Sequence, residues 1–187
     1  AFLSATTFLL RMYFIKEQYI LSHSLRTQSI LLETWYQFRM VLTEELLCRG
    51  ALLYILIKII GQIKAISISS VIFAIMHWLN AGVWGNVTQM IIVFTFTFLM
   101  GLLLAYSYAR TLSLFFSFAI HFGWNLTQNY IFPDNSVGNH IFTLVNPVPI
   151  VTISYLTFFT MLLLPKIAVL VIDYLIIKQH RQVDYTS

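Results

Sequence analysis

Thr43-Glu44-Glu45-Leu46-Leu47-Cys48-Arg49-Gly50 is the stretch that constrains the fold of this chain most strongly. Two adjacent carboxylates and an arginine stand at the head of an apolar run that continues to Ile60. One charge inside a lipid-spanning helix costs about 2.5–3.5 kcal/mol on insertion scales. Charges at this density are therefore tolerated in a membrane only where they face a polar cavity or one another.

Helical spacing predicts different surroundings for the two carboxylates. Glu45 and Arg49 are four residues apart, so they share a helix face and can pair. Glu44 lies about 100° around the helix from Glu45, because one turn holds 3.6 residues. A paired carboxylate is a poor base, whereas Glu44 has Cys48 rather than a cation four residues on. Taken alone, the stretch also fits a structural ion pair that holds helices together.

Composition indicates a membrane protein. The chain is 59% hydrophobic and 10% charged, whereas soluble domains are about 25% charged. We therefore expect an all-α fold, a polytopic transmembrane helical bundle with a polar intramembrane cavity. The 187 residues give room for about five to seven spans of ~20 residues. We expect one transmembrane domain over residues 1–187, with a motif-bearing core over 41–129 and a helix start missing at the N-terminus.

Apolar runs and turn residues predict the order of the elements. An amphipathic interfacial helix is expected over 16–39, loops over 79–86 and 133–149, and a kink near Pro165. The expected membrane spans cover 40–60, 65–78, 87–109, 112–131 and 150–177.

The basic residues indicate orientation rather than a nucleic-acid partner. The net charge is +4 and is spread over single residues, without a basic patch. Lys58, Lys64, Arg110, Lys178 and Arg181 all fall on one side of the expected spans. The positive-inside rule then places the C-terminus in the cytoplasm, and we expect a bacterial cytoplasmic membrane. The single cysteine excludes an internal disulfide, and we expect Cys48 to be a small packing residue.

Two further polar signals lie in apolar helices. They are Phe73-x-x-x-His77 and His121-x-x-x-Asn125. Residues four apart lie on one helix face, so His121 and Asn125 point the same way. Ionisable groups within a membrane are functional candidates by default, and a carboxylate with imidazoles is a combination that activates water.

These motifs, in the order Glu-Glu-x-x-x-Arg, Phe-x-x-x-His and His-x-x-x-Asn, resemble the CAAX prenyl endopeptidase family. The bacterial branch of that family is called the CPBP or Abi family of intramembrane proteases. The resemblance covers roughly Val41 to Asn129 and includes Gly50 and the Gly101-Leu-Leu-Leu-Ala-Tyr segment. It implies an all-helical membrane fold and hydrolysis of a peptide bond.

The resemblance also implies a role for each polar residue. Glu44 would be the base that activates water, assisted by His77, while His121 and Asn125 would hold the oxyanion. The partners would be membrane lipid and a peptide or membrane-protein substrate; no pattern indicates the oligomeric state.

Glu45 and Arg49 would orient the site. Members of the family have been described both as metalloproteases and as metal-independent glutamate proteases, and both forms stay open here. A metal-dependent form would bind zinc or another divalent metal through Glu44, His77 and His121, a set that suffices for catalytic zinc. The zincin pattern His-Glu-x-x-His is absent, which favours the form without a cofactor.

Two other function classes compete with the protease. A small transporter or channel could use the Glu and His residues as a proton relay, but the chain has no internal repeat. A catalytically silent immunity or scaffold protein could keep the fold, although such a protein is expected to have lost Glu44, His77 or His121.

Overall fold

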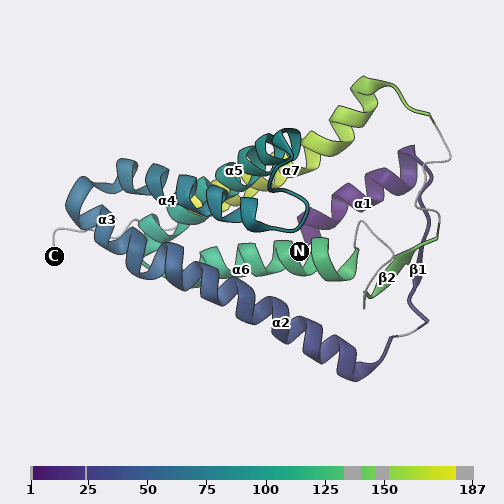
Figure 1. Cartoon of the computed structure of the whole chain (residues 1–187), viewed down its shortest axis with the longest axis horizontal. Helices are drawn as coiled ribbons and strands as arrows, with labels where there is room; N and C mark the ends of the chain where they lie inside the picture. The colour runs from purple at the N-terminus through teal and green to yellow at the C-terminus, as the bar shows by residue number, and fades with distance from the viewer. Residues whose placement is uncertain (1, 24, 133–139, 146–151, 180–187) are drawn as a thin grey trace. The chain divides into compact units, whose positions relative to one another are not determined.

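The structure is a computed structural model, and it describes residues 2–23, 25–132, 140–145 and 152–179. Helices make up most of these residues (Figure 1), which confirms the predicted all-α class. The predicted loop over 133–149 and the tail after 179 lie largely outside the described residues. In chain order the elements are α1 (Phe2–Phe14), β1 (Tyr19–Leu21), α2 (Thr27–Glu45), η1 (Leu46–Leu52), α3 (Leu53–Ile60), α4 (Gln62–Met76), η2 (His77–Leu79), α5 (Val87–Thr111), α6 (Leu114–Asn125), η3 (Leu126–Ile131), β2 (Phe142–Leu144) and α7 (Tyr155–Gln179).

Several helices have the length and apolar composition needed to cross a membrane. Within the described part of the chain there are three, namely Gln62–Leu79, Val87–Thr111 and Tyr155–Gln179. They correspond to the spans expected over 65–78, 87–109 and 150–177. The last helix runs through Pro165, where the sequence predicts a kink.

The charged motif lies where one long helix changes its winding. The chain is helical without a break from Thr27 to Ile60, and the segment Leu46–Leu52 between α2 and α3 is a π-helix. A second π-helix, η3, follows Asn125 directly. Both widened turns thus begin immediately after residues that the sequence singles out. π-Helical turns are rare and are frequent at functional sites.

The prediction of one helix over 16–39 is wrong at its start. Residues 19–21 form β1, which pairs antiparallel with β2 in the register Tyr19↔Leu144 and Leu21↔Phe142, and the helix begins only at Thr27. Lys16 has a positive φ of 57°, which interrupts helical winding. The pairing partner lies far along the chain, so local periodicity carries no sign of this strand.

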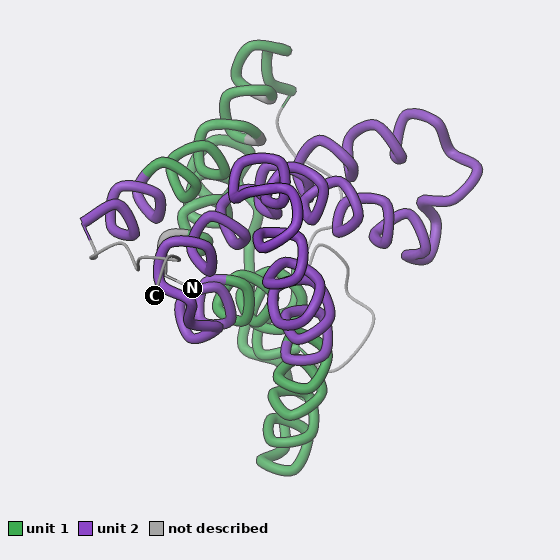
Figure 2. The backbone as a smooth tube through the Cα atoms, turned by 90° about the vertical axis from the view of Figure 1, so that its left-hand side faces the viewer, with its two compact units in different colours: residues 1–41, 121–171 green, residues 42–120, 172–187 purple. Residues whose placement is uncertain are grey.

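The described residues fall into two compact units, coloured separately in Figure 2. Unit 1 comprises residues 1–41 and 121–171, and unit 2 comprises residues 42–120 and 172–187. In unit 1 the rings of Phe8, Phe132 and Phe142 stack, with centroids 4.9 Å apart for each of the two neighbouring pairs. In unit 2 a core packs α3, α4 and α5 against one another. The single domain expected from composition stays a prediction.

Helices α4 and α5 approach each other closely at Gly101. A Cβ atom built on this glycine would lie 3.1 Å from Ser70 Cα and 3.2 Å from Phe73 Cδ1. Such contacts are tighter than ordinary van der Waals distances, so the backbone of α5 occupies the space that a side chain would need. Phe73 is therefore packed against α5 on one side. Its other neighbours, Arg49 and His77, belong to the candidate site.

Candidate active site

Glu45 and Arg49 form a fully buried ion pair at the start of η1. Arg49 Nη1 donates to Glu45 Oε1 at 2.9 Å, and both side chains are 0% exposed. The pairing predicted from the four-residue spacing is thus confirmed. Within the described part of the chain, Arg49 Nε and Nη2 are buried without a hydrogen-bond partner. One nitrogen makes the bond, and the guanidinium does not form a two-nitrogen fork with the carboxylate.

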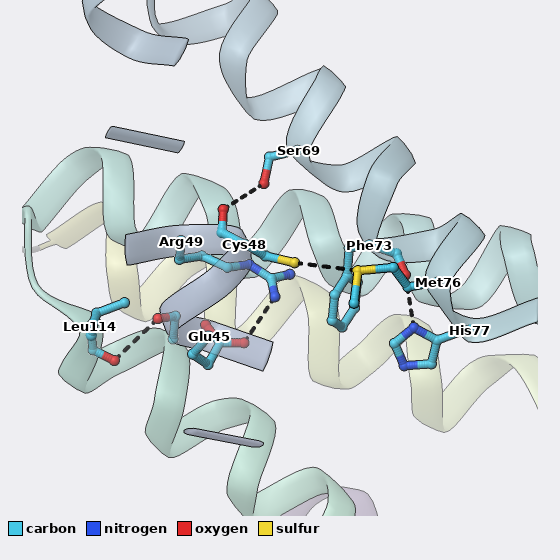
Figure 3. Close-up of polar contacts among 9 residues, drawn as sticks. Glu45, Cys48, Arg49, Ser69, Phe73, Met76, His77 and Leu114 are labelled. Carbon is cyan, nitrogen blue, oxygen red and sulfur yellow. Dashed lines mark hydrogen bonds and ion pairs between the residues drawn. The ribbon is translucent and has the colours of Figure 1, made fainter. Parts of the chain in front are cut away.

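The guanidinium of Arg49 also lies over an aromatic ring. Its central carbon is 4.0 Å from the ring centroid of Phe73, which belongs to α4. A cation over a ring face is attracted by the ring quadrupole, and the attraction is stronger away from water. Phe73 is 2% exposed. This contact links the first motif to the second, as Figure 3 shows.

His77, at the C-terminal end of α4, is held by the same phenylalanine. Its Nδ1 lies 2.8 Å from the Phe73 carbonyl oxygen, and the two rings meet edge to face with centroids 4.5 Å apart. Because a carbonyl oxygen only accepts, Nδ1 carries the proton in this contact. The lone pair of the neutral imidazole is then on Nε2. His77 is partly exposed, so this nitrogen belongs to a ring that solvent or substrate can reach.

The π-helical turn is fastened to α4 by two further contacts. Ser69 Oγ donates to the Cys48 carbonyl oxygen at 3.0 Å, and Cys48 Sγ lies 3.9 Å from Met76 Sδ. Ser69, Phe73 and Met76 follow one another at helical spacing, so one face of α4 contacts η1 (Figure 3). Cys48 is 1% exposed, in agreement with its predicted packing role.

The sequence does not single out Ser69, and it names Phe73 only as part of the His77 motif. A serine in an apolar helix usually bonds to its own backbone. The contact with Cys48 joins residues 21 positions apart. The one available signal was a group of serines, Ser67, Ser69 and Ser70, in a mostly apolar helix.

The remaining candidate residues lie at three places. Glu44 is partly exposed and is the penultimate residue of α2. His121 is 2% exposed, and Asn125, four residues on, ends α6 and is partly exposed. Glu44 belongs to unit 2, whereas His121 and Asn125 belong to unit 1. The structure therefore gathers Glu45, Arg49 and His77 around Phe73, and the convergence of this group with the third motif stays a prediction.

Comparison with known proteins gives a family match. A family model described as type II CAAX prenyl endopeptidase Rce1-like matches residues 27–127, which is more than half of the chain. The matched range contains all six candidate residues and confirms the resemblance that the motifs indicated. Neither the curated proteins nor the solved structures gave a match.

Proposed function

Because the chain belongs to the type II CAAX prenyl endopeptidase Rce1-like family, we propose that it is an intramembrane endopeptidase in which Glu44 activates the attacking water. Its apolar helices and its family make it an integral membrane protein. The substrate is a peptide or protein held at the membrane. The Lys/Arg asymmetry supports a cytoplasmic C-terminus, and a bacterial cytoplasmic membrane is part of the same proposal.

The buried Glu45–Arg49 pair is the observation that carries this proposal. Glu45 is 0% exposed and is paired with the guanidinium of Arg49 at 2.9 Å, so its charge is neutralised by the arginine and water does not reach it. Glu44 is partly exposed. A general base must lie within hydrogen-bond reach of the water it deprotonates. Of the two adjacent carboxylates, Glu44 is thus the one suited to that role.

The proposed reaction conserves protons and returns the enzyme to its starting state. Glu44 takes a proton from water while the water oxygen attacks the carbonyl carbon of the scissile peptide. The carbonyl electron pair moves onto its oxygen, and the resulting oxyanion accepts hydrogen bonds from His121 and Asn125. The C–N bond then breaks, and the leaving nitrogen takes the proton from Glu44.

His77 orients the water in this mechanism. The bond from Nδ1 to the Phe73 carbonyl fixes the ring and leaves the lone pair on Nε2. That nitrogen accepts a hydrogen bond from the same water, so the other water proton is directed to Glu44. Glu45 and Arg49 act as positioning residues, because their pair fixes the helix segment that carries Glu44.

A metal-dependent form of the enzyme would use Glu44, His77 and His121 as ligands. One carboxylate and two imidazoles are donors that zinc accepts. In the part of the chain that the structure describes, no three His, Cys, Asp or Glu side chains are grouped so as to hold a metal ion. The mechanism above is the form that uses only the protein's own groups, and chelation tests that choice.

Turnover of quenched peptides by purified protein in detergent tests the proposal. The panel includes cysteine peptides with and without a prenyl group, because the family description names a prenyl endopeptidase. Glu44→Gln keeps the shape but removes the base, so turnover should be abolished with the melting temperature unchanged. Glu45→Gln should lower turnover and also destabilise the protein by about 3–5 kcal/mol, because Arg49 is left buried without its counter-charge. A chelator should leave wild-type turnover intact.

Different results would overturn different parts of the proposal. An active Glu44→Gln variant beside an inactive, equally stable Glu45→Gln variant would reverse the two roles. Loss of wild-type turnover in chelator, restored by added zinc, would replace the glutamate mechanism with a metal-dependent one. A wild-type protein that cleaves no peptide in the panel would count against the protease and favour a silent scaffold.

A further inference from the structure

Ser69 and Ser70 are adjacent, fully buried serines with different hydrogen-bond partners. Both are 0% exposed. Ser70 Oγ donates to the Ile66 carbonyl at 2.7 Å, within its own helix. Ser69 Oγ instead donates to the Cys48 carbonyl of η1 at 3.0 Å (Figure 3). The hydroxyl of Ser69 therefore donates to a neighbouring segment, although a serine in a helix usually donates to a carbonyl of its own helix.

The carbonyl that Ser69 binds lies in the middle of the π-helical turn. A π-helix pairs each carbonyl with the amide five residues on, and such turns survive only as short pieces inside α-helices. A carbonyl has two lone pairs, so it accepts a second donor beside the helix bond. Away from water, a hydroxyl group gains by finding such a partner. The Ser69 bond thus supports a turn that local winding alone does not favour.

The turn matters because Arg49 lies inside it. Cys48 directly precedes Arg49, and η1 begins directly after Glu45. If the turn relaxed into an α-helix, its residues would change their angular positions around the helix axis, because α- and π-helices hold different numbers of residues in a turn. Arg49 would then turn relative to α4, and its guanidinium would leave its position 4.0 Å from the centroid of the Phe73 ring.

We propose that Ser69 is a positioning residue: its bond to the Cys48 carbonyl holds the π-helical turn in the winding that places Arg49 against Phe73. This inference rests on the proposed function, since the Glu45–Arg49 pair fixes the segment that carries Glu44. Ser69 does not contact the reacting groups and acts only through the backbone of η1.

The single cysteine allows the bond itself to be observed. The chain contains one Cys, so cysteine labelled with ¹³C at the carbonyl and arginine labelled with ¹⁵N mark one peptide bond, Cys48–Arg49. A carbonyl–amide correlation spectrum of the full chain in detergent then shows one signal. In Ser69→Ala this carbonyl signal should move upfield, because a hydrogen bond is lost. In the matched control Ser70→Ala it should stay in place.

The same samples report the position of Arg49. Its Nε–H is buried, and its signal is assigned by its loss in Arg49→Lys. Ser69→Ala should shift this signal, whereas Ser70→Ala should not. Turnover should fall by up to about 10²-fold through kcat with KM little changed, since a small misplacement of a site costs this much. Ser69→Thr, which keeps the hydroxyl, should restore the carbonyl signal and kcat.

Each result decides one step of the inference. An unmoved carbonyl signal in Ser69→Ala would show that Ser69 does not bind the Cys48 carbonyl. A moved carbonyl signal with an unmoved Arg49 Nε–H signal overturns the positioning role, as does wild-type kcat in an active enzyme. If the wild type cleaves no peptide, the proposed function fails, and the two nuclear magnetic resonance signals alone still decide whether Ser69 positions Arg49.

Discussion

At the scale of single residues, the guanidinium of Arg49 is held by one hydrogen bond and one aromatic ring. Nη1 bonds to Glu45 at 2.9 Å, and the central carbon lies 4.0 Å from the Phe73 centroid. A lysine ammonium is a point charge on a flexible stem and does not lie flat on a ring. The ring contact is therefore the part of the arrangement that a lysine does not reproduce.

We predict that Arg49→Lys lowers turnover at unchanged expression and destabilises the protein by about 2 kcal/mol, the value of a desolvated cation–π contact. Melting temperature and turnover in detergent measure the two effects. Arg39→Lys is the control, because Arg39 is exposed on α2, and it should change neither quantity. Wild-type turnover in Arg49→Lys would mean that the site does not need a planar cation.

The sequence predicted part of this arrangement and missed the rest for a physical reason. The Glu45–Arg49 pair lies within one helix, where a separation of four residues decides which side chains meet. The Phe73 and Ser69 contacts join η1 to α4, and no spacing rule relates residues on different helices.

At the scale of elements, the packing of α4 against α5 fixes the position of Phe73. A Cβ atom on Gly101 would come within 3.2 Å of both Ser70 Cβ and Phe73 Cδ1. Backbone and a buried ring give way less readily than the end of a flexible side chain. The absence of a side chain at Gly101 thus determines how closely α5 packs against the Phe73 ring, which contacts Arg49 and His77.

We predict that Gly101→Ala destabilises the protein by about 1–3 kcal/mol, the usual cost of overpacking, and lowers turnover as well. Gly50→Ala is the matched control. A Cβ on Gly50 would lie no closer than 3.9 Å to its neighbours, and alanine is favoured over glycine in a helix by roughly 0.5–1 kcal/mol. Thermal unfolding in detergent measures both variants. Equal stability of Gly101→Ala and wild type would show that α4 and α5 can separate without cost.

Element boundaries were predictable where the signal was local. The spans expected over 65–78 and 87–109, for example, lie within a few residues of the observed helices α4 and α5. The π-helical turns were not predictable, because their support comes from other segments, as in the bond from Ser69 to Cys48. The β1–β2 pair was missed because its two strands lie at distant positions in the chain.

At the scale of the whole molecule, the sequence predicts that polar residues from distant helices lie close together. Glu44 lies on α2 and His121 on α6. In a membrane each of these groups needs a polar partner or water, and a peptide carbonyl must be reached by the base and the oxyanion donors together. The sequence predicts that they face one cavity, although its helix patterns give no distance between helices.

We predict that cysteines at positions 44 and 121 can be joined by a short bifunctional thiol reagent, because side chains that share one water molecule lie within about 10 Å of each other. The experiment uses the full chain in membranes with Cys48→Ala, so that the two introduced thiols are the only ones present. Position 119 is the control partner, because Ala119 is exposed and lies about 200° around α6 from His121.

Cross-linking of Glu44→Cys with His121→Cys, and not with Ala119→Cys, would support a shared cavity. Equal cross-linking of both pairs would show that the helices move enough for either position to react, and it would not support a shared cavity. Absence of a 44–121 product in a folded protein would mean that the oxyanion site assigned to His121 and Asn125 is wrong, while leaving the Glu45–Arg49 pair and its support by α4 unaffected.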